Sequence, residues 1–413
     1  MPSPSQPDQP PPDHGDAPAV TAWSVFRVFL YLGCTSFGGP VAHLGYFRAL
    51  LVEKKRWLDD RTYGDLVALC QFLPGPSSSQ VGFAIGLIKA GYRGGLAAWL
   101  GFTMPSALLM VLFAFSLAEY GDIFPPALIS GLKLVAVSVV AHAVLTMGRS
   151  LAPDRPRQLI ALAAMAILLA VPSPLMQLAV IAAGALAGVV MLPRSTFAAG
   201  HGRTAFAGGL ASLAFLSLAF GLLAALPMLA ALVEHPILAL ADGFYRAGAL
   251  VFGGGHVVLP LLKSAVMDPG WVTDAEFLAG YGAAQAIPGP LFTVAAFLGM
   301  MTGIGPAGLG GAGLALVAIF LASFLMLLGV MPFWRSLREH ALVRRALDGI
   351  NAAVVGLLLA VLINPIMMTG IRGPVDVAIG LGGFLLLAFG VMRPILVVGL
   401  IVLASLGAAS IPL

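Results

Sequence analysis

The residues QFLPGPSSSQVG at 71–82 place a Pro-Gly-Pro turn inside an apolar stretch, and QAIPGPLFTVAA at 285–296 does so a second time. Proline in a helix interior loses a hydrogen bond and clashes with the preceding turn, so each Pro-Gly-Pro should end one helix and begin another. The apolar runs on either side are each shorter than the ~20 residues that a helix needs to cross ~30 Å of hydrocarbon. The sequence therefore predicts two re-entrant hairpins of half-helices, at 62–73 with 77–91 and at 274–287 with 290–304.

The composition places these hairpins in a membrane. Of 413 residues, 59% are hydrophobic and 10% are charged, against about 25% charged in a soluble domain, and the mean hydropathy is +0.98. The net charge of +4 is small, and the basic residues lie in loops between apolar runs, where membrane topology rather than nucleic acid explains them. We therefore expect an all-α polytopic membrane protein without a nucleic-acid partner, located as a multi-pass protein in the cell membrane.

The N-terminus and the cysteines carry little information on function. The first 20 residues contain seven prolines, three aspartates and no Lys or Arg, which is the opposite of a signal peptide and predicts a disordered tail. Cys34 and Cys70 lie within apolar segments, where cysteines more often pack as small hydrophobic residues than form a disulfide or a metal site.

The chain contains an internal repeat. FLYLGCTSFGGPV at 29–41 aligns with FYRAGALVFGGGH at 244–256, and WLDDRTYGDLVALCQFLPGP at 57–76 aligns with WVTDAEFLAGYGAAQAIPGP at 271–290. Shorter matches follow, MPSALLM with LASFLML and SGLKLVAV with DGINAAVV. Transporter folds are often duplicated in this way. The predicted domains are a tail at 1–20, a first repeat at 21–193, a linker with an extra transmembrane helix at 194–235, and a second repeat at 236–413.

Basic clusters predict the orientation of the repeats. They lie at 48–61, at Lys89 and Arg93, and at 149–157, 194–203 and 335–345, and the connections between spans near 119–122, 172–174 and 234 lack basic residues. Under the positive-inside rule an odd number of spanning helices separates the two hairpin regions, so the second repeat is inverted. The spans are expected at 95–119, 126–149, 157–172, 174–192 and 205–226, and then at 308–331, 341–363, 374–390 and 392–411. The sequence leaves open whether residues 22–55 span or re-enter the membrane.

The two hairpin tips form the predicted binding site. A half-helix that starts inside the membrane presents free N–H groups and a partial charge of about +0.5, which suits an anion. After the first turn Ser77, Ser78, Ser79 and Gln80 add hydroxyl and amide donors, whereas only Thr293 does so after the second. We therefore expect an oxyanion site that the two tips share unequally.

Charged residues in apolar runs are further candidates for this site. Lys133 and Arg246 lie within apolar segments, where ionisable groups indicate function. Asn351 occupies the position of Lys133 in the second repeat. Snorkelling to the membrane interface is the alternative for Arg246, as it is for Arg27 and Lys89.

Uncharged polar residues raise a similar choice. For His43, His142 and His256, a structural role with satisfied hydrogen bonds competes with proton transfer. Gln71 and Gln285 stand three residues before each Pro-Gly-Pro, and because a buried amide needs partners, we expect them to line the site or brace the tips.

Taken together, these motifs resemble a known family. FGGPVAHLGYFRALLVEKKRWLDD followed by QFLPGPSSSQVGFAIG, and FGGGHVVLPLL followed by QAIPGPLFTVAAFLG, look like the two halves of the long, two-domain chromate ion transporters. The resemblance implies export of chromate from the cytoplasm by two homologous halves, with sulfate as a similar oxyanion. By position it implies that the site includes the motif residues Phe37, Gly38, Gly39, His43, Gln71, Pro74, Gly75 and Pro76 of the first half and Phe252, Gly253, Gly254, Gly255, Gln285, Pro288, Gly289 and Pro290 of the second.

The function expected is secondary transport by alternating access, driven by the membrane potential or by ion exchange. Moving two negative charges outward at ~100 mV is favourable by roughly 4.6 kcal/mol. A transporter of sulfate or another oxyanion, and an anion channel, are the alternatives. No GxxxxGK[ST], HExxH, GxSxG or CxxC motif occurs, so an ATP motor, an enzyme, a metal site and a cofactor are not expected. The expected partners are chromate, sulfate and lipid, and the oligomeric state, including a homodimer, stays open.

Overall fold

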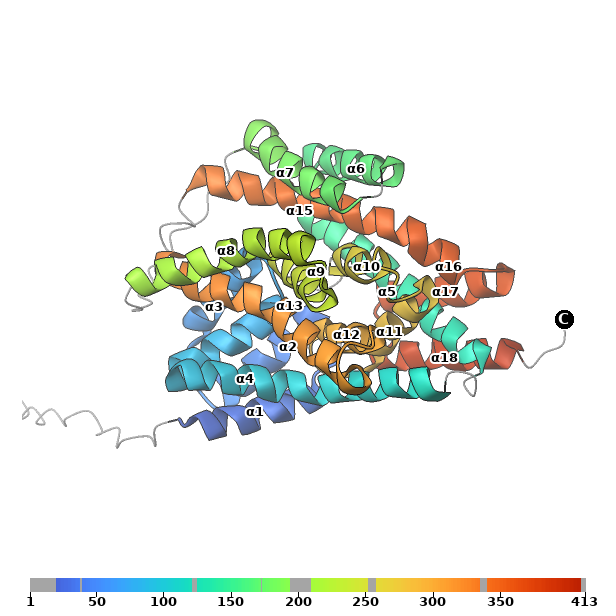
Figure 1. The fold of residues 1–413 in the computed structure, drawn as a ribbon, viewed down its shortest axis with the longest axis horizontal. Helices are drawn as coiled ribbons and strands as arrows, with labels where there is room; N and C mark the ends of the chain where they lie inside the picture. Colours follow the sequence, from blue (N-terminus) through green and yellow to red (C-terminus); the bar gives the residue numbers. More distant parts are fainter. Residues whose placement is uncertain are drawn as a thin grey trace, which may run out of the picture.

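The computed structural model describes residues 20–37, 39–120, 125–171, 173–193, 209–251, 258–334 and 340–409. Within these ranges every regular element is a helix (Figure 1). Some sequence expectations concern residues outside the described ranges and stay predictions: the disordered tail up to residue 19, and the motif residues Gly38, Phe252, Gly253, Gly254, Gly255 and His256.

Long apolar helices confirm an all-α, multi-pass integral membrane protein. Five helical stretches among the described residues are long and apolar enough to cross a membrane. They are Ser77–Tyr120, Pro126–Leu151, Leu210–Val233, Pro306–Phe333 and Ala341–Gly370.

The region before the first Pro-Gly-Pro consists of short helices. α1 (Ala22–Thr35) and α2 (Gly39–Phe47) are separated by a break, and a π-helical segment, Arg48–Lys54, follows α2. At 1.5 Å per residue, the 14 residues of α1 extend about 21 Å. Because this is less than the hydrocarbon thickness, neither α1 nor α2 is long enough to cross a membrane alone.

A helix, a turn and a second helix surround the first Pro-Gly-Pro, and re-entry of this pair into the membrane stays a prediction. α3 (Asp60–Phe72) begins at Asp59, whose carboxylate accepts the N–H of Thr62 at 2.8 Å and so caps the helix. α4 (Ser77–Tyr120) follows the Pro-Gly-Pro turn, as expected from the proline positions.

A kink divides α4 into the short arm and the long span that the sequence predicts. The backbone leaves helical geometry at Ala90 and Gly91, where φ of Gly91 is +64°. Beyond this kink the chain folds back on the arm. The two segments approach closely: a Cβ atom added at Gly86 would lie only 2.2 Å from the carbonyl oxygen of Gly94.

The second repeat has the same order of short helices. A Cβ atom at Gly299 in α12 would lie 2.3 Å from the carbonyl oxygen of Gly311 in α13, which reproduces the close approach of the arm and the span in the first repeat. These helices are α9 (Pro236–Leu250), α10 (Val258–Met267), α11 (Asp274–Ala286), the 3-10 turn η4 (Leu291–Thr293), α12 (Val294–Met301) and α13 (Leu309–Val330).

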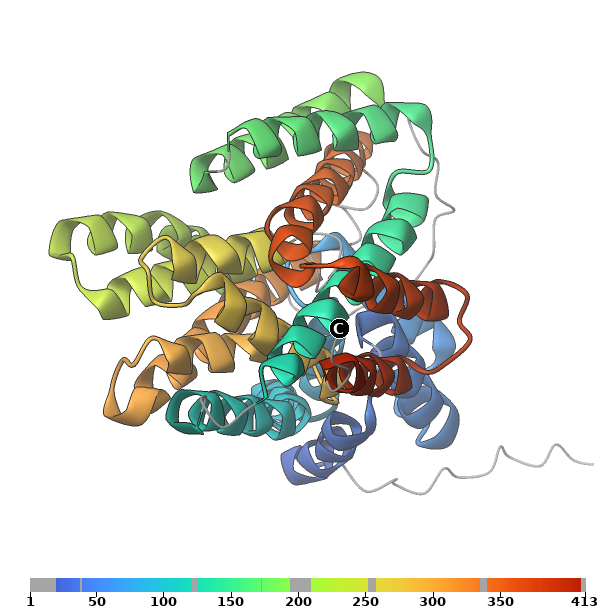
Figure 2. The same ribbon diagram turned by 90° about the vertical axis from the view of Figure 1, so that its right-hand side faces the viewer.

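The remaining helices pack across the repeats. The pair α6 and α7, from the first repeat, packs on α15 of the second, whereas α17 and α18, from the second repeat, pack on α5 of the first (Figures 1 and 2). Each repeat therefore covers a long helix of the other. The bounds are α5 Pro126–Leu151, α6 Arg155–Ala170, α7 Pro174–Met191, α15 Ala341–Val361, α17 Pro374–Ala388 and α18 Pro394–Ala409, with the short segments η7 Leu362–Met367 and α16 Met368–Gly370 after α15.

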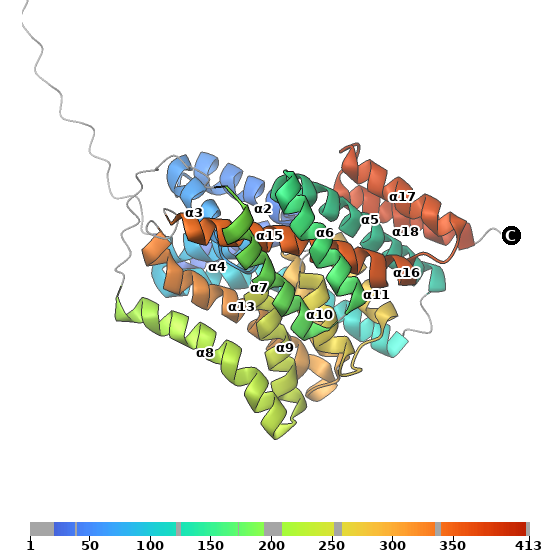
Figure 3. The same cartoon turned by 90° about the horizontal axis from the view of Figure 1, so that it is seen from above.

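The extra helix between the repeats is α8 (Leu210–Val233), which lies at the edge of the assembly beside α9 and α13 (Figure 3). It begins and ends later than the predicted range 205–226 because the sequence is apolar throughout this region, so hydropathy alone does not mark its ends. Within α8 only Ser212 and Ala219 are buried, so most of the helix is available to contact lipid.

Candidate functional site

Each Pro-Gly-Pro turn is held by the other repeat. The N–H of Gly75 donates to the carbonyl of Val251 at 2.6 Å, and the N–H of Gly289 donates to the carbonyl of Ser36 at 2.8 Å. Ser36 and Val251 occupy equivalent positions, because they are the residues at which α1 and α9 end. Each turn therefore contacts the C-terminal end of the first helix of the opposite repeat.

Both turns are too tightly packed to accept a side chain at glycine. A Cβ atom at Gly75 would lie 2.3 Å from Cβ of Ser323, and one at Gly289 would lie 2.7 Å from Oγ of Ser106. Ser106 and Ser323 are again equivalent residues of the two repeats. The φ angles of +116° at Gly75 and +103° at Gly289 also favour glycine.

A group of six buried polar residues adjoins these turns and is called the polar cluster below. Its central residue, His43, places Nδ1 3.3 Å from Oγ of Ser78, and its ring lies beside the backbone of Ser36 and 5.2 Å from the ring of Phe102. Each member is at most 2% exposed. The polar cluster consists of Ser36, His43, Ser78, Ser79, Gln80 and Thr103.

Five of the six residues in the polar cluster have a side-chain atom without a hydrogen-bond partner. The amide nitrogen of Gln80 donates to the carbonyl of Pro74 at 2.9 Å and so braces the turn, but Oε1 of Gln80 has no partner. Buried polar atoms in native proteins are nearly always paired with protein or water, so these atoms are available to hydrogen-bond a polar group that enters the cluster. The other unpaired atoms are Oγ of Ser36, Nε2 of His43, Oγ of Ser79 and Oγ1 of Thr103.

The equivalent positions of the second repeat are almost all apolar. Thr293, the counterpart of Ser79, is polar, but its hydroxyl donates to the carbonyl of Pro290 at 2.9 Å and is already satisfied. Among these six pairs of positions the unpaired groups therefore lie in the first repeat, although Nε2 of Gln285, three residues before the second turn, is also buried without a partner. The counterparts of the other five members are Val251, Val258, Phe292, Val294 and Phe320.

The predicted cations Lys133 and Arg246 interact with charged residues that are not members of the polar cluster. Lys133 is buried on α5, where its nearest charges are those of Arg372 and Asp274. Arg246 forms an ion pair with Asp242 within α9. The charge of Arg246 is thus compensated within α9, whereas Arg372 repels the charge of Lys133, and no ion pair of Lys133 occurs among the described residues.

Arg246 also lines a cavity. This cavity, of about 250 Å³, lies between α7, α9 and α10, and its lining includes Gln177, Asp242 and Ser264.

The other predicted site residues, three amides and Phe37, differ in how deeply they are buried. Gln71 is exposed at the end of α3, so its side chain does not reach into the polar cluster. Gln285 is partly buried and interacts with the hydroxyl of Tyr281. Asn351 is partly buried on α15, and Phe37 is partly buried in the link between α1 and α2.

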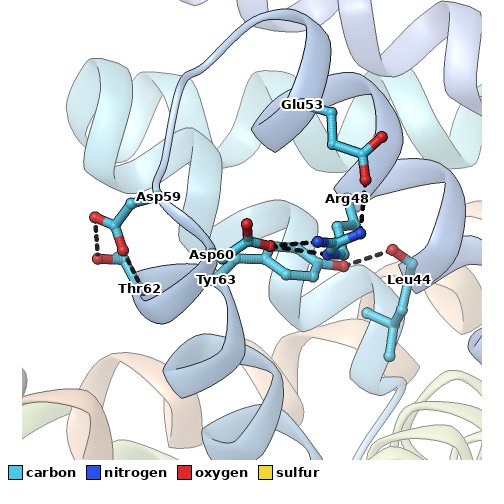
Figure 4. Close-up of polar contacts among 7 residues, drawn as sticks. All are labelled: Leu44, Arg48, Glu53, Asp59, Asp60, Thr62 and Tyr63. Carbon is cyan, nitrogen blue, oxygen red and sulfur yellow. Dashed lines mark hydrogen bonds and ion pairs between the residues drawn. The ribbon is translucent and has the colours of Figure 1, made fainter.

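An ion pair between equivalent residues lies at the base of each hairpin region, on the side away from its turn. Arg48 contacts Asp60 at 2.7 Å and Glu53 at 2.6 Å (Figure 4), and these carboxylates raise the pKa of Arg48 above its usual value. In the second repeat Lys263 lies 3.8 Å from Asp274, at the positions equivalent to Arg48 and Asp60. Both repeats thus have this ion pair, as both have a turn that contacts the opposite repeat.

Sequence reasoning missed Ser36, Thr103, Ser106 and Ser323. A signal existed for the last two, because MPSALLM and LASFLML align a serine with a serine. It existed in weaker form for Ser36, which directly precedes the Phe-Gly-Gly motif. Thr103 aligns with Phe320 of the second repeat, so the repeat gave no signal for Thr103.

Comparison with known proteins places the chain among transporters. It matches the chromate transporter family over residues 23–189 and 238–408. A chromate transport protein of Pseudomonas aeruginosa is 30% identical over 86% of this chain and 84% of its own length, and one of Cupriavidus metallidurans is 28% identical over 82% and 81%. An uncharacterized transporter of Methanocaldococcus jannaschii is 27% identical over 83% and 84%.

No solved structure matches the chain significantly. The family match covers both hairpin regions and the helices that follow each of them, and in bacteria such multi-pass proteins reside in the plasma membrane. The chain therefore belongs to the chromate transporter family.

Proposed function

We propose that this protein exports chromate from the cytoplasm by alternating access, and that the polar cluster holds the oxyanion. The observation that carries the proposal is the group of unpaired, buried polar atoms around His43 and Ser78, next to both Pro-Gly-Pro turns. The printed names of the relatives from P. aeruginosa and C. metallidurans support chromate as the substrate.

The chemistry of the polar cluster suits a tetrahedral oxyanion. Hydroxyl groups of Ser36, Ser78, Ser79 and Thr103 can each donate a hydrogen bond. α4 begins at Ser77, so the N–H groups of its first turn and its partial positive charge adjoin the same residues. Chromate and sulfate share this shape and charge, so both should compete for the cluster.

Alternating access requires the closed cluster to open toward one side at a time. The two hydrogen bonds from Gly75 to Val251 and from Gly289 to Ser36 are equivalent in the repeat. If the repeats are inverted, as the basic clusters predict, these two contacts face opposite sides of the membrane. Release of one contact while the other is kept would expose the polar cluster to one side only.

The direction of transport follows from charge. A dianion leaving a cell that is negative inside by ~100 mV gains roughly 4.6 kcal/mol. Export by this route needs no nucleotide, in agreement with the lack of a GxxxxGK[ST] motif.

Transport of chromate into and out of proteoliposomes, with an imposed potential, tests the proposal. Ser78→Ala and Thr103→Val should each weaken apparent chromate affinity by about 10- to 100-fold, because a hydrogen bond to a charged group contributes ~1.5–3 kcal/mol. Ser116→Ala is the matched control, since Ser116 lies on α4 with its hydroxyl on the carbonyl of Leu112 in an exposed position.

Three results of this assay would overturn the proposal. Wild-type kinetics in both cluster variants would remove the polar cluster from the mechanism. Sulfate flux without chromate flux would show that the substrate is sulfate and not chromate. A chromate current that does not saturate with concentration would show that the protein is a channel and not a carrier.

A further inference from the structure

The polar cluster has no permanently charged side chain. Of its six members only His43 can carry a charge; of the predicted cations, Arg246 is ion-paired with Asp242, and Lys133 is buried on α5 and is not a member of the polar cluster. Resting on the function proposed above, we infer that the oxyanion binds together with one proton, which is taken from solvent and held on the imidazole of His43.

The charge balance favours this proton. A helix N-terminus contributes about +0.5, and helices begin after both turns, at Ser77 and at Leu291. Together they amount to about +1 against a dianion. An uncompensated charge in a buried site is costly, and one imidazolium would bring the balance to about zero.

The geometry of His43 provides a place for the added proton. Its Nδ1 is engaged with Oγ of Ser78 at 3.3 Å, whereas Nε2 is buried without a partner. Neutral imidazole has one N–H, and imidazolium has two. Protonation therefore gives His43 a second donor while the contact with Ser78 is kept.

His43 also lies between the two turns. Ser78 is in the first helical turn after Pro76, and the backbone of Ser36, beside the imidazole, accepts the N–H of Gly289. A charge on His43 is therefore placed where both turns converge, which is where the oxyanion is proposed to bind.

The titratable groups on neighbouring helices are engaged or distant. On α3 the hydroxyl of Tyr63 donates to the carbonyl of Leu44 at 2.7 Å, and Cys70 is buried in the apolar core. On α1 Cys34 is exposed and Arg27 and Tyr31 line a surface cavity near Lys55.

The charged groups nearest along α2 and α4 are also engaged or distant. Arg48 is paired with Asp60 and Glu53 (Figure 4), and Lys89 is about 16 Å from Ser78 along the first arm of α4. Among the described residues no carboxylate is recorded in contact with His43, so a bound oxyanion would be the natural counter-ion of its imidazolium.

Proton coupling changes what is transported. The complex that reorients would carry one net negative charge instead of two, so a given membrane potential would contribute half as much to export. Acidification of the side from which chromate binds would favour loading, because a proton is a co-substrate on that side.

Calorimetric titration of the purified full-length protein with chromate tests the inference. The titration is run at mildly alkaline pH, where free chromate is deprotonated, in two buffers of different ionisation enthalpy. The difference between the two heats gives the number of protons taken up. We expect about one proton per chromate in the wild type and none in His43→Gln, which keeps a side-chain donor but does not titrate.

His142→Gln is the matched control. His142 is a partly buried histidine on α5 outside the polar cluster, so this variant should take up the same number of protons as the wild type. Chromate binding without proton uptake in the wild type, or unchanged uptake in His43→Gln, overturns the inference while the proposed function stands. If chromate does not bind the wild type in either buffer, the proposed function fails, and the inference with it.

Discussion

Replacement of Gly75 by alanine tests whether the first Pro-Gly-Pro turn is held by contacts with the second repeat. The backbone at Gly75 has φ of +116°, which costs an L-residue roughly 1–2 kcal/mol. The added Cβ atom would lie 2.3 Å from Cβ of Ser323, and overpacking of this kind costs about 1–3 kcal/mol. The sum, about 2–5 kcal/mol, is a large fraction of the stability of a typical domain.

The free energy of unfolding, measured by SDS titration in mixed micelles, and chromate flux in proteoliposomes are the two readouts. Gly75→Ala should lower both, because the N–H of Gly75 is displaced from the carbonyl of Val251. Gly91→Ala is the matched control: Gly91 has φ of +64° and ψ of −160° but no atom within 4 Å of an added Cβ, so only the backbone cost of about 1–3 kcal/mol applies.

A second variant separates the contact from the backbone conformation. Combining Gly75→Ala with Ser323→Gly removes one of the two clashing Cβ atoms, so the double-mutant cycle should show a favourable coupling of about 1–3 kcal/mol. If Gly75→Ala is as stable and active as Gly91→Ala, or if the coupling is zero, the turn is not held by the opposite repeat in the way described.

Two further predictions concern the contacts around the hairpins. Gly282→Ala should destabilise the protein by about 1–3 kcal/mol in the same SDS titration, because its Cβ would lie 2.1 Å from the carbonyl oxygen of Leu132 and would force α11 away from α5; unchanged stability would contradict this packing. Arg48→Gln should leave the unfolding transition unchanged within error, because Arg48 and its partners Asp60 and Glu53 are half exposed and exposed ion pairs contribute little; a clear loss of stability would assign these ion pairs a structural role.

Local rules predicted much of the fold. The prolines at 74–76 and 288–290 mark the two turns, and the helices on either side of each turn lie where the sequence predicts them. The kink at Gly91 also agrees with the predicted boundary between a short arm and a long span. These features depend on backbone chemistry that a single residue determines, so they can be read from short stretches.

Features that depend on contacts between distant residues could not be predicted in this way. The sequence indicated that the two turns are related, but not that Gly75 docks on Val251 and Gly289 on Ser36. Lys133 was a candidate because it is charged, and only the fold shows that its nearest charges lie outside the polar cluster. Thr103 is polar in an apolar span, and only the fold shows that its hydroxyl is buried without a partner.

The duplication also allows the side chains of the polar cluster to differ between the two repeats. Each turn needs a backbone carbonyl and a small side chain from the opposite repeat, and Ser36 and Val251 supply that carbonyl equally well although their side chains differ. The side chains near the turns are therefore free to diverge without loss of the fold. A carrier needs a single site that faces each side in succession, whereas a pore needs donors or charges along its lining. The polar cluster lies in one repeat, and its counterparts in the other include Val258, Phe292 and Phe320, an arrangement that agrees with the single site of the proposed carrier.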